Sequence, residues 1–209
     1  MRWHEFLKKF SDQPLFHSSM LGIFNDEWTN IQIQLTRWQK TGKITQIRRG
    51  WYLIEKPYRQ KDIPLPVIAN QVVHPSYLSL EWALQYYQII PESVPNLTSI
   101  TTTRGTEFVF KDHIFIYHFM QPSLFTGYIQ EEYETKSIFI AYAEKALFDK
   151  IYLFTQREKF SLDWLRELRL QNLEEFDIGR FQSYLTKTKK PGLHQAIELT
   201  SRFINKLQS

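Results

Sequence analysis

The sequence predicts an α+β protein that begins with a small helical unit ending in a hairpin, continues as a mixed α/β domain and finishes in a helical tail. Two observations predict it. Hydrophobic residues make up 43% of the 209 residues, which is enough to form a buried core. Apolar residues recur at helical spacing near both ends of the chain, and β-branched and aromatic residues alternate in the middle. The chain has no cysteine, which excludes disulfide scaffolds, Cys-ligated metal sites and thiol catalysis.

Charge and proline content divide the chain near residue 60. Residues 1–61 carry 11 Lys and Arg against 5 Asp and Glu, whereas residues 62–209 carry 15 against 17. A basic first part suggests a polyanionic partner, although surface charges that merely fall unevenly give the same count. Three prolines between residues 57 and 66 predict a linker. We therefore expect a first domain over residues 1–60 and a second over 61–209, mixed α+β to about 155 and helical over 156–209.

The first 25 residues predict two short helices. The first covers residues 2–10, where apolar residues recur at helical spacing, and it ends before Pro14. The second begins near Ser18 or Ser19, since either residue is a suitable N-cap.

A third helix is predicted from Glu27 to about Lys40, and it carries the candidate site. Four apolar residues share one side and are expected to be buried: Trp28, Ile31, Leu35 and Trp38. The opposite side has no carboxylate after Glu27 and offers short polar groups, a guanidinium, an ammonium and one apolar group. Such side chains read base edges and contact phosphates. The candidate DNA-binding residues on this helix are Thr29, Asn30, Ile33, Arg37 and Lys40.

Residues 43–54 predict a β-hairpin, because β-branched and aromatic residues flank a corner formed by Arg48, Arg49 and Gly50. Three helices followed by a hairpin with a basic tip are typical of a winged helix-turn-helix. In that fold the third helix enters the major groove while the hairpin contacts phosphate or the minor groove. Arg48 and Arg49 therefore join the candidate DNA-binding residues. Two alternatives stay open: a winged helix that docks a protein, and the N-terminal layer of one larger core.

Four segments follow this unit in an order that resembles a known family. They are YLSLEWALQYYQIIPE (77–92), TSITTTRGTEFVF (98–110), IYHFMQPSLFTGY (116–128) and IAYAEKALFDKIYL (140–153). With the N-terminal unit they resemble the AbiEi-type antitoxins, the transcriptional-regulator half of bacterial type IV toxin–antitoxin systems, over residues 5–155. Two positions differ, since the family usually has Gly where Gln88 stands and Pro where Ala143 stands.

The resemblance implies an autorepressor that binds double-stranded DNA, at repeats in its own promoter, through residues 1–60. It also implies an antitoxin domain that counters an AbiEii-like nucleotidyltransferase toxin, by direct binding or without a stable complex. Arg104 or Lys145 would then contact the toxin or extend the DNA contact. The plainer interpretation of Lys145 is an exposed ion pair with Asp149, one helical turn away. The oligomeric state stays open, with a dimer on DNA as one option, and an orphan regulator without a toxin fits the same sequence.

No nucleotide-binding loop, nucleophile motif or metal-ligand spacing is present, so we expect neither an enzyme nor a cofactor or metal site. No apolar run reaches the length of about 18 residues that a membrane span needs, and no secretory signal is recognised. We therefore expect a cytoplasmic protein.

The tail predicts three helices. Ser161 caps the first, Asp177 caps the second, which runs to Thr188, and the third follows Pro191-Gly192. The basic run at residues 187–190 has two interpretations. It contacts DNA or an acidic toxin surface, or its lysines complement the dipole at the end of the second helix.

Overall fold

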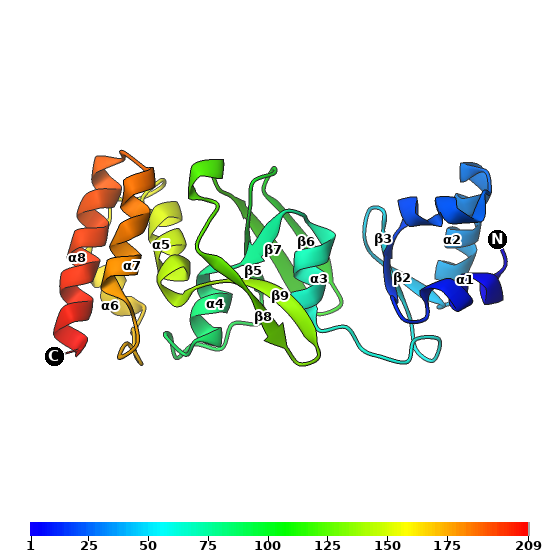
Figure 1. Ribbon diagram of the computed structural model, residues 1–209, viewed down its shortest axis with the longest axis horizontal. Helices are drawn as coiled ribbons and strands as arrows, with labels where there is room; N and C mark the ends of the chain where they lie inside the picture. The colour runs from blue at the N-terminus through cyan, green and yellow to red at the C-terminus, as the bar shows by residue number, and fades with distance from the viewer. Residues whose placement is uncertain (209) are drawn as a thin grey trace.

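The computed structural model describes residues 1–208 as an elongated α+β molecule with the two chain termini at opposite ends (Figure 1). A small N-terminal unit lies at one end, a six-stranded sheet in the middle and a group of helices at the other end. The predicted α+β class is confirmed.

The N-terminal unit combines three helical segments with a three-stranded antiparallel sheet. Its elements are α1 (Trp3–Phe10), β1 (Leu15–His17), the 3₁₀ helix η1 (Ser18–Phe24), α2 (Trp28–Lys40), β2 (Ile44–Arg48) and β3 (Trp51–Ile54). The predicted first helix, third helix and hairpin are confirmed, and the second helix is a short 3₁₀ helix. The sequence does not predict β1, because three residues are too few to show alternation. β1 pairs with β3, so the strand order is β1-β3-β2.

Aromatic packing holds α2 against this sheet. The ring of Phe6 lies 4.9 Å from that of Trp38, 4.9 Å from that of Phe10 and 5.0 Å from that of Phe16. Phe6 and Phe16 are fully buried, and Trp38 is nearly so. Because this core fixes one side of α2, the opposite side of the helix faces outward.

The second domain is built on the six-stranded sheet, with strand order β6-β7-β5-β4-β9-β8. Its elements are α3 (Leu65–Val72), β4 (Ser76–Leu78), α4 (Leu80–Tyr86), β5 (Leu97–Thr101), β6 (Thr106–Phe110), β7 (His113–Phe119), the 3₁₀ helix η2 (Pro122–Leu124), β8 (Tyr128–Tyr133), β9 (Lys136–Ala141) and α5 (Ala143–Phe154). β5 runs parallel to β7, and β4 runs parallel to β9; the other pairs are antiparallel. The sequence pattern predicts strands over residues 100–103, 108–110, 113–119 and 138–140, and the structure adds β4 and β8 to them.

The tail is helical, as the sequence predicts. It contains α6 (Leu162–Glu167), α7 (Ile178–Ser183), the 3₁₀ helix η3 (Tyr184–Lys187) and α8 (Pro191–Gln208). Both predicted caps are confirmed: Ser161 Oγ accepts from the Trp164 amide at 3.2 Å, and Asp177 Oδ1 accepts from the Arg180 amide at 2.9 Å. α8 begins at Pro191, directly after the basic run.

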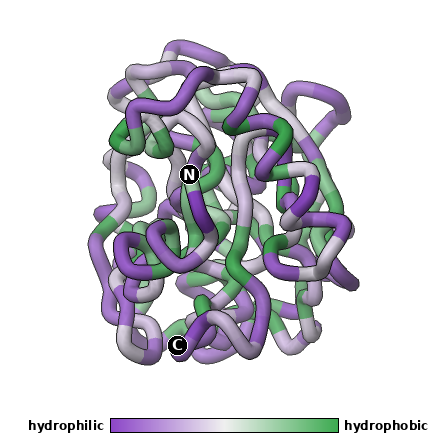
Figure 2. Tube along the Cα trace, turned by 90° about the vertical axis from the view of Figure 1, so that its right-hand side faces the viewer, coloured by the Kyte–Doolittle hydropathy of each residue, from purple (hydrophilic) through white to green (hydrophobic). Residues whose placement is uncertain are grey.

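The N-terminal sheet also packs on the second domain. Leu15, Ile47 and Leu53 belong to the large hydrophobic core of the second domain rather than to the smaller core around Phe6. Lys111 Nζ, after β6, lies 3.8 Å from a carboxylate oxygen of Glu55. Figure 2 looks at this end of the molecule and shows hydrophilic segments along much of its outline. The hairpin therefore has one face fixed by the second domain.

Replacing Gly127 with alanine is expected to lower the free energy of unfolding by about 2–4 kcal/mol. Gly127 has φ +76°, and an added Cβ would lie 2.6 Å from Tyr184 Oη, on a side chain that is nearly buried. Gly22→Ala is the matched control, because nothing lies within 4 Å of its added Cβ. Urea unfolding of both variants measures the difference. Equal stability of the two would show that Tyr184 does not pack on Gly127.

Candidate nucleic-acid interface

The outward side of α2 carries the candidate residues predicted from the sequence. Thr29, Asn30, Ile33, Arg37 and Lys40 are all exposed, whereas Ile31, Leu35 and Trp38 are buried. Ile33 is 43% exposed, which leaves its side chain free to contact an apolar group such as a thymine methyl. α2 has no Asp or Glu along its length.

Trp28 departs from the prediction. The helical pattern assigns it to the buried side, but it is 50% exposed. Trp28 is the first residue of α2, where the helix extends past the aromatic core, so no residue of that core covers its indole. Its ring instead lines a groove at the surface.

The tip of the β2–β3 hairpin places its two arginines in different surroundings. Arg49 is exposed. Arg48 is half-buried, and its guanidinium carbon lies 5.8 Å from the centre of the Phe108 ring in β6. Gly50 has φ +84° and closes the turn, and its carbonyl accepts from the Ser18 amide at 2.7 Å. Arg49 is therefore the more accessible of the two arginines, while Arg48 also contacts the second domain.

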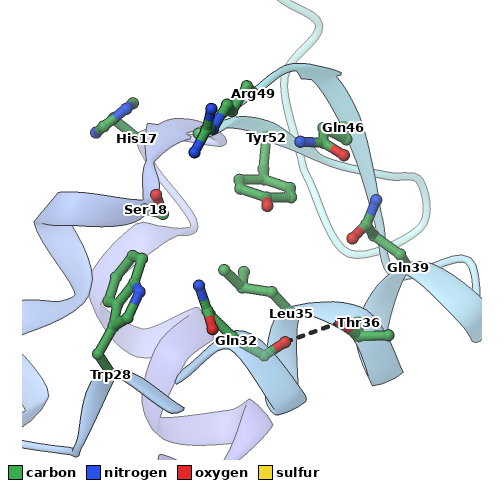
Figure 3. A pocket seen from close by; sticks show the side chains of 11 residues that line it. His17, Ser18, Trp28, Gln32, Leu35, Thr36, Gln39, Gln46, Arg49 and Tyr52 are labelled. Carbon is green, nitrogen blue, oxygen red and sulfur yellow. Dashed lines mark hydrogen bonds between the residues drawn. The ribbon is translucent and has the colours of Figure 1, made fainter. Parts of the chain in front are cut away.

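A groove of about 750 Å³ lies between α2, the hairpin and the junction of β1 with η1, and we call it the α2–hairpin groove. Its lining residues are His17, Ser18, Trp28, Gln32, Leu35, Thr36, Gln39, Gln46, Arg49, Gly50 and Tyr52. Figure 3 shows Gln32 and Thr36 of α2 on one side, with Gln46 and Arg49 of the hairpin across from them. Three side-chain amides and a guanidinium face this space, and none of its lining residues is a carboxylate.

Hydrogen bonds and burial keep the walls of the α2–hairpin groove in place. Thr36 Oγ1 donates to the Gln32 carbonyl at 2.9 Å (Figure 3). His17 Nδ1 lies 2.7 Å from Ser19 Oγ, and the His17 ring packs on Trp51 with 5.3 Å between centres. Burial raises the pKa of Tyr52 above its ordinary value.

The sequence pattern does not single out the three glutamines of the groove. Gln32 and Gln39 are seven residues apart and share one flank of α2, but the pattern alone does not show that the hairpin faces this flank. Gln46 belongs to β2, whose position follows from the sheet. Amide side chains pair with adenine edges, and guanidinium groups pair with phosphate or guanine. The groove and the adjoining outward side of α2 are therefore suited to an anionic ligand with base edges.

Lys145 cannot contact a ligand from its place in the structure, which corrects the sequence-based prediction. Its predicted ion pair with Asp149 exists, but both side chains are fully buried rather than exposed. Asp149 also accepts from the hydroxyls of Ser79 at 2.8 Å and Tyr77 at 3.0 Å. Burial lowers the pKa of Lys145 and raises that of Asp149, while the ion pair opposes both shifts. Arg104 differs, since it is exposed in the turn between β5 and β6.

Within residues 1–208, no group of three His, Asp or Glu side chains is placed to hold a metal ion. His113 and His118 lie on β7 five residues apart, so they point to opposite faces of the sheet and cannot bind one metal ion together.

Among the described residues, no helix combines the length and the apolarity that crossing a membrane requires. No protein-family model matches the chain, and no curated protein matches it either.

Proposed function

We propose that residues 1–60 form a winged helix-turn-helix that binds double-stranded DNA, and that the protein is a cytoplasmic transcriptional autorepressor. The α2–hairpin groove carries the proposal, because it presents three amides and a guanidinium without a carboxylate. The order α1-β1-η1-α2-β2-β3 supports it, since winged helices place a recognition helix directly before a hairpin. In this proposal α2 enters the major groove and Arg49 contacts phosphate.

The antitoxin activity forms the second half of the proposal and rests on the resemblance of the second domain to AbiEi-type antitoxins. It requires a nucleotidyltransferase gene in the same operon, whose product arrests growth when expressed alone. Co-expression of this protein is expected to restore growth. Rescue by the full chain, expressed from a promoter that lacks the operator, would separate neutralisation from repression. An operon without such a gene, or a toxin that is not rescued, contradicts this half and leaves an orphan regulator.

The DNA-binding half is tested by fluorescence anisotropy on a labelled fragment from upstream of the gene. We expect the native fragment to bind at least about 10³-fold more tightly than a scrambled fragment. We also expect log K to fall linearly as the logarithm of the salt concentration rises, because phosphate contacts release counterions. Equal affinity for both fragments with weak salt dependence would contradict the proposal and favour the alternative, a winged helix that docks a protein.

A further inference from the structure

A second basic site lies in the helical tail, away from the α2–hairpin groove. An open hollow of about 510 Å³ is formed where η2 lies against η3, and the residues between η3 and α8 complete its lining. We call it the lysine hollow. Its lining residues are Gln121, Ser123, Thr186, Lys187, Thr188, Lys189 and Lys190.

The three lysines of the hollow have no acidic partner in the part of the chain that the structure describes. None of the ion pairs among residues 1–208 involves Lys187, Lys189 or Lys190, and no carboxylate lines the hollow. All three lysines are exposed, and three ammonium groups within four residues create a local excess of positive charge that attracts anions. Lys187 also adds to the positive potential at buried Lys145, whose pKa is lowered first by burial and further by this charge.

Helix stability does not account for these charges. Only Lys187 lies in a last helical turn, that of η3, where a cation complements the dipole. Lys189 and Lys190 directly precede Pro191, the first residue of α8, and a positive charge is unfavourable at the N-terminus of a helix. This corrects the interpretation that the whole run complements a helix end.

The hollow also holds its donors in place. Lys190 Nζ lies 3.5 Å from Tyr152 Oη and 4.6 Å from the centre of that ring, so the ring favours one position of this exposed ammonium. Thr188 is only 9% exposed, and its carbonyl lies 3.0 Å from His194 Nε2. The Ser123 hydroxyl and the Gln121 amide add two donors to the lining, whereas the Thr186 hydroxyl already donates to the Ser183 carbonyl at 2.8 Å. Ammonium, hydroxyl and amide donors without a carboxylate match the oxygen atoms of a phosphate group.

We propose that the lysine hollow binds phosphate groups, supplied either by a free polyphosphate such as a nucleoside triphosphate or by a nucleic-acid backbone. This site goes beyond the proposed DNA-binding function and does not rest on it, because no residue of the α2–hairpin groove takes part.

The test follows backbone amide resonances of the ¹⁵N-labelled full chain during titration with sodium tripolyphosphate. We expect saturable shifts at Ser123, Thr188 and Gly192. In Lys187→Gln/Lys189→Gln we expect the dissociation constant to rise about tenfold or more. Lys136→Gln/Lys159→Gln removes the same charge from two exposed lysines elsewhere and is expected to bind like the wild type.

Titrations with ATP and with a scrambled 16-bp duplex then identify the source of the phosphate. Shifts at Gly192 with ATP alone assign the site to a free polyphosphate, and shifts with the duplex assign it to a nucleic-acid backbone; both outcomes support the site. Because the readout is local, a duplex bound only at α2 does not imitate it. Absence of saturable shifts with tripolyphosphate, or equal weakening in both double variants, would overturn the proposal.

Discussion

Replacing Lys145 with methionine is expected to lower the free energy of unfolding by about 3–5 kcal/mol. Lys145 and Asp149 are both fully buried and form an ion pair. Methionine fills a similar volume but leaves the Asp149 carboxylate without its cation, where water does not reach it. The hydroxyls of Ser79 and Tyr77 still donate to the carboxylate, yet they carry no charge. Urea unfolding followed by circular dichroism measures the change.

Two further variants separate the loss of charge from the loss of packing. Lys145→Met/Asp149→Asn removes both charges and keeps an oxygen acceptor for the two hydroxyls, so we expect it to recover more than half of the lost stability. Lys136→Met, at an exposed lysine, is expected to change stability by less than about 0.5 kcal/mol. If Lys145→Met stays within about 1 kcal/mol of the wild type, as exposed ion pairs do, the pair is not buried in solution.

The same pair shows what a local pattern predicts and what it omits. The spacing of Lys145 and Asp149 correctly predicts an ion pair, since side chains four residues apart meet on a helix. It does not predict burial, because the groups that cover the pair come from distant parts of the chain. The Lys145 ammonium lies 5.8 Å from the ring of Tyr77 in β4 and 5.6 Å from that of Tyr184 in η3. Tertiary packing therefore decides the exposure of Lys145.

The strands likewise divide into those that the sequence predicts and those that only tertiary pairing establishes. Long runs with alternating β-branched and aromatic residues, such as β7, are predicted from the sequence. β4 is a central strand but has only three residues, and all three are buried, so it shows no alternation. β8 is an edge strand that carries Glu131 and Glu132, residues that are rare in strands. Pairing with β9 makes β8 a strand, and a single sequence does not reveal that pairing.

The sequence predicts only part of the candidate interface, because tertiary contacts decide the rest. The 3.6-residue period predicts which side of α2 faces outward, and Asn30 and Arg37 lie there. The groove glutamines depend on where the hairpin lies, and that position follows from β1 pairing with β3. Trp28 fits the buried side by period alone, but the core does not extend to the first residue of the helix.

Arg49→Ala is expected to weaken DNA binding on every sequence, whereas Asn30→Ala and Gln32→Ala are expected to relax the preference for the native operator. A guanidinium at the hairpin tip contacts phosphates, which carry no base sequence, so its loss lowers the salt slope by about 1. The two amides read base edges, and loss of a bidentate contact costs about 1–3 kcal/mol on the native fragment only. Anisotropy titrations on native and scrambled fragments at several salt concentrations measure both effects. Arg202→Ala, at an exposed arginine of α8, controls for the loss of a positive charge.

The two amide variants also report which flank of α2 lies against the bases. Residues two apart on a helix point roughly 200° apart, so Asn30 and Gln32 occupy opposite flanks of the outward side. Gln32 faces the α2–hairpin groove, and Asn30 does not line it. If only Gln32→Ala changes base preference, the bases lie on the hairpin side of α2; if only Asn30→Ala does, they lie on the far side. If all three variants act alike across a panel of operator variants, the division between phosphate-contacting and base-reading residues is wrong, and the groove serves another ligand.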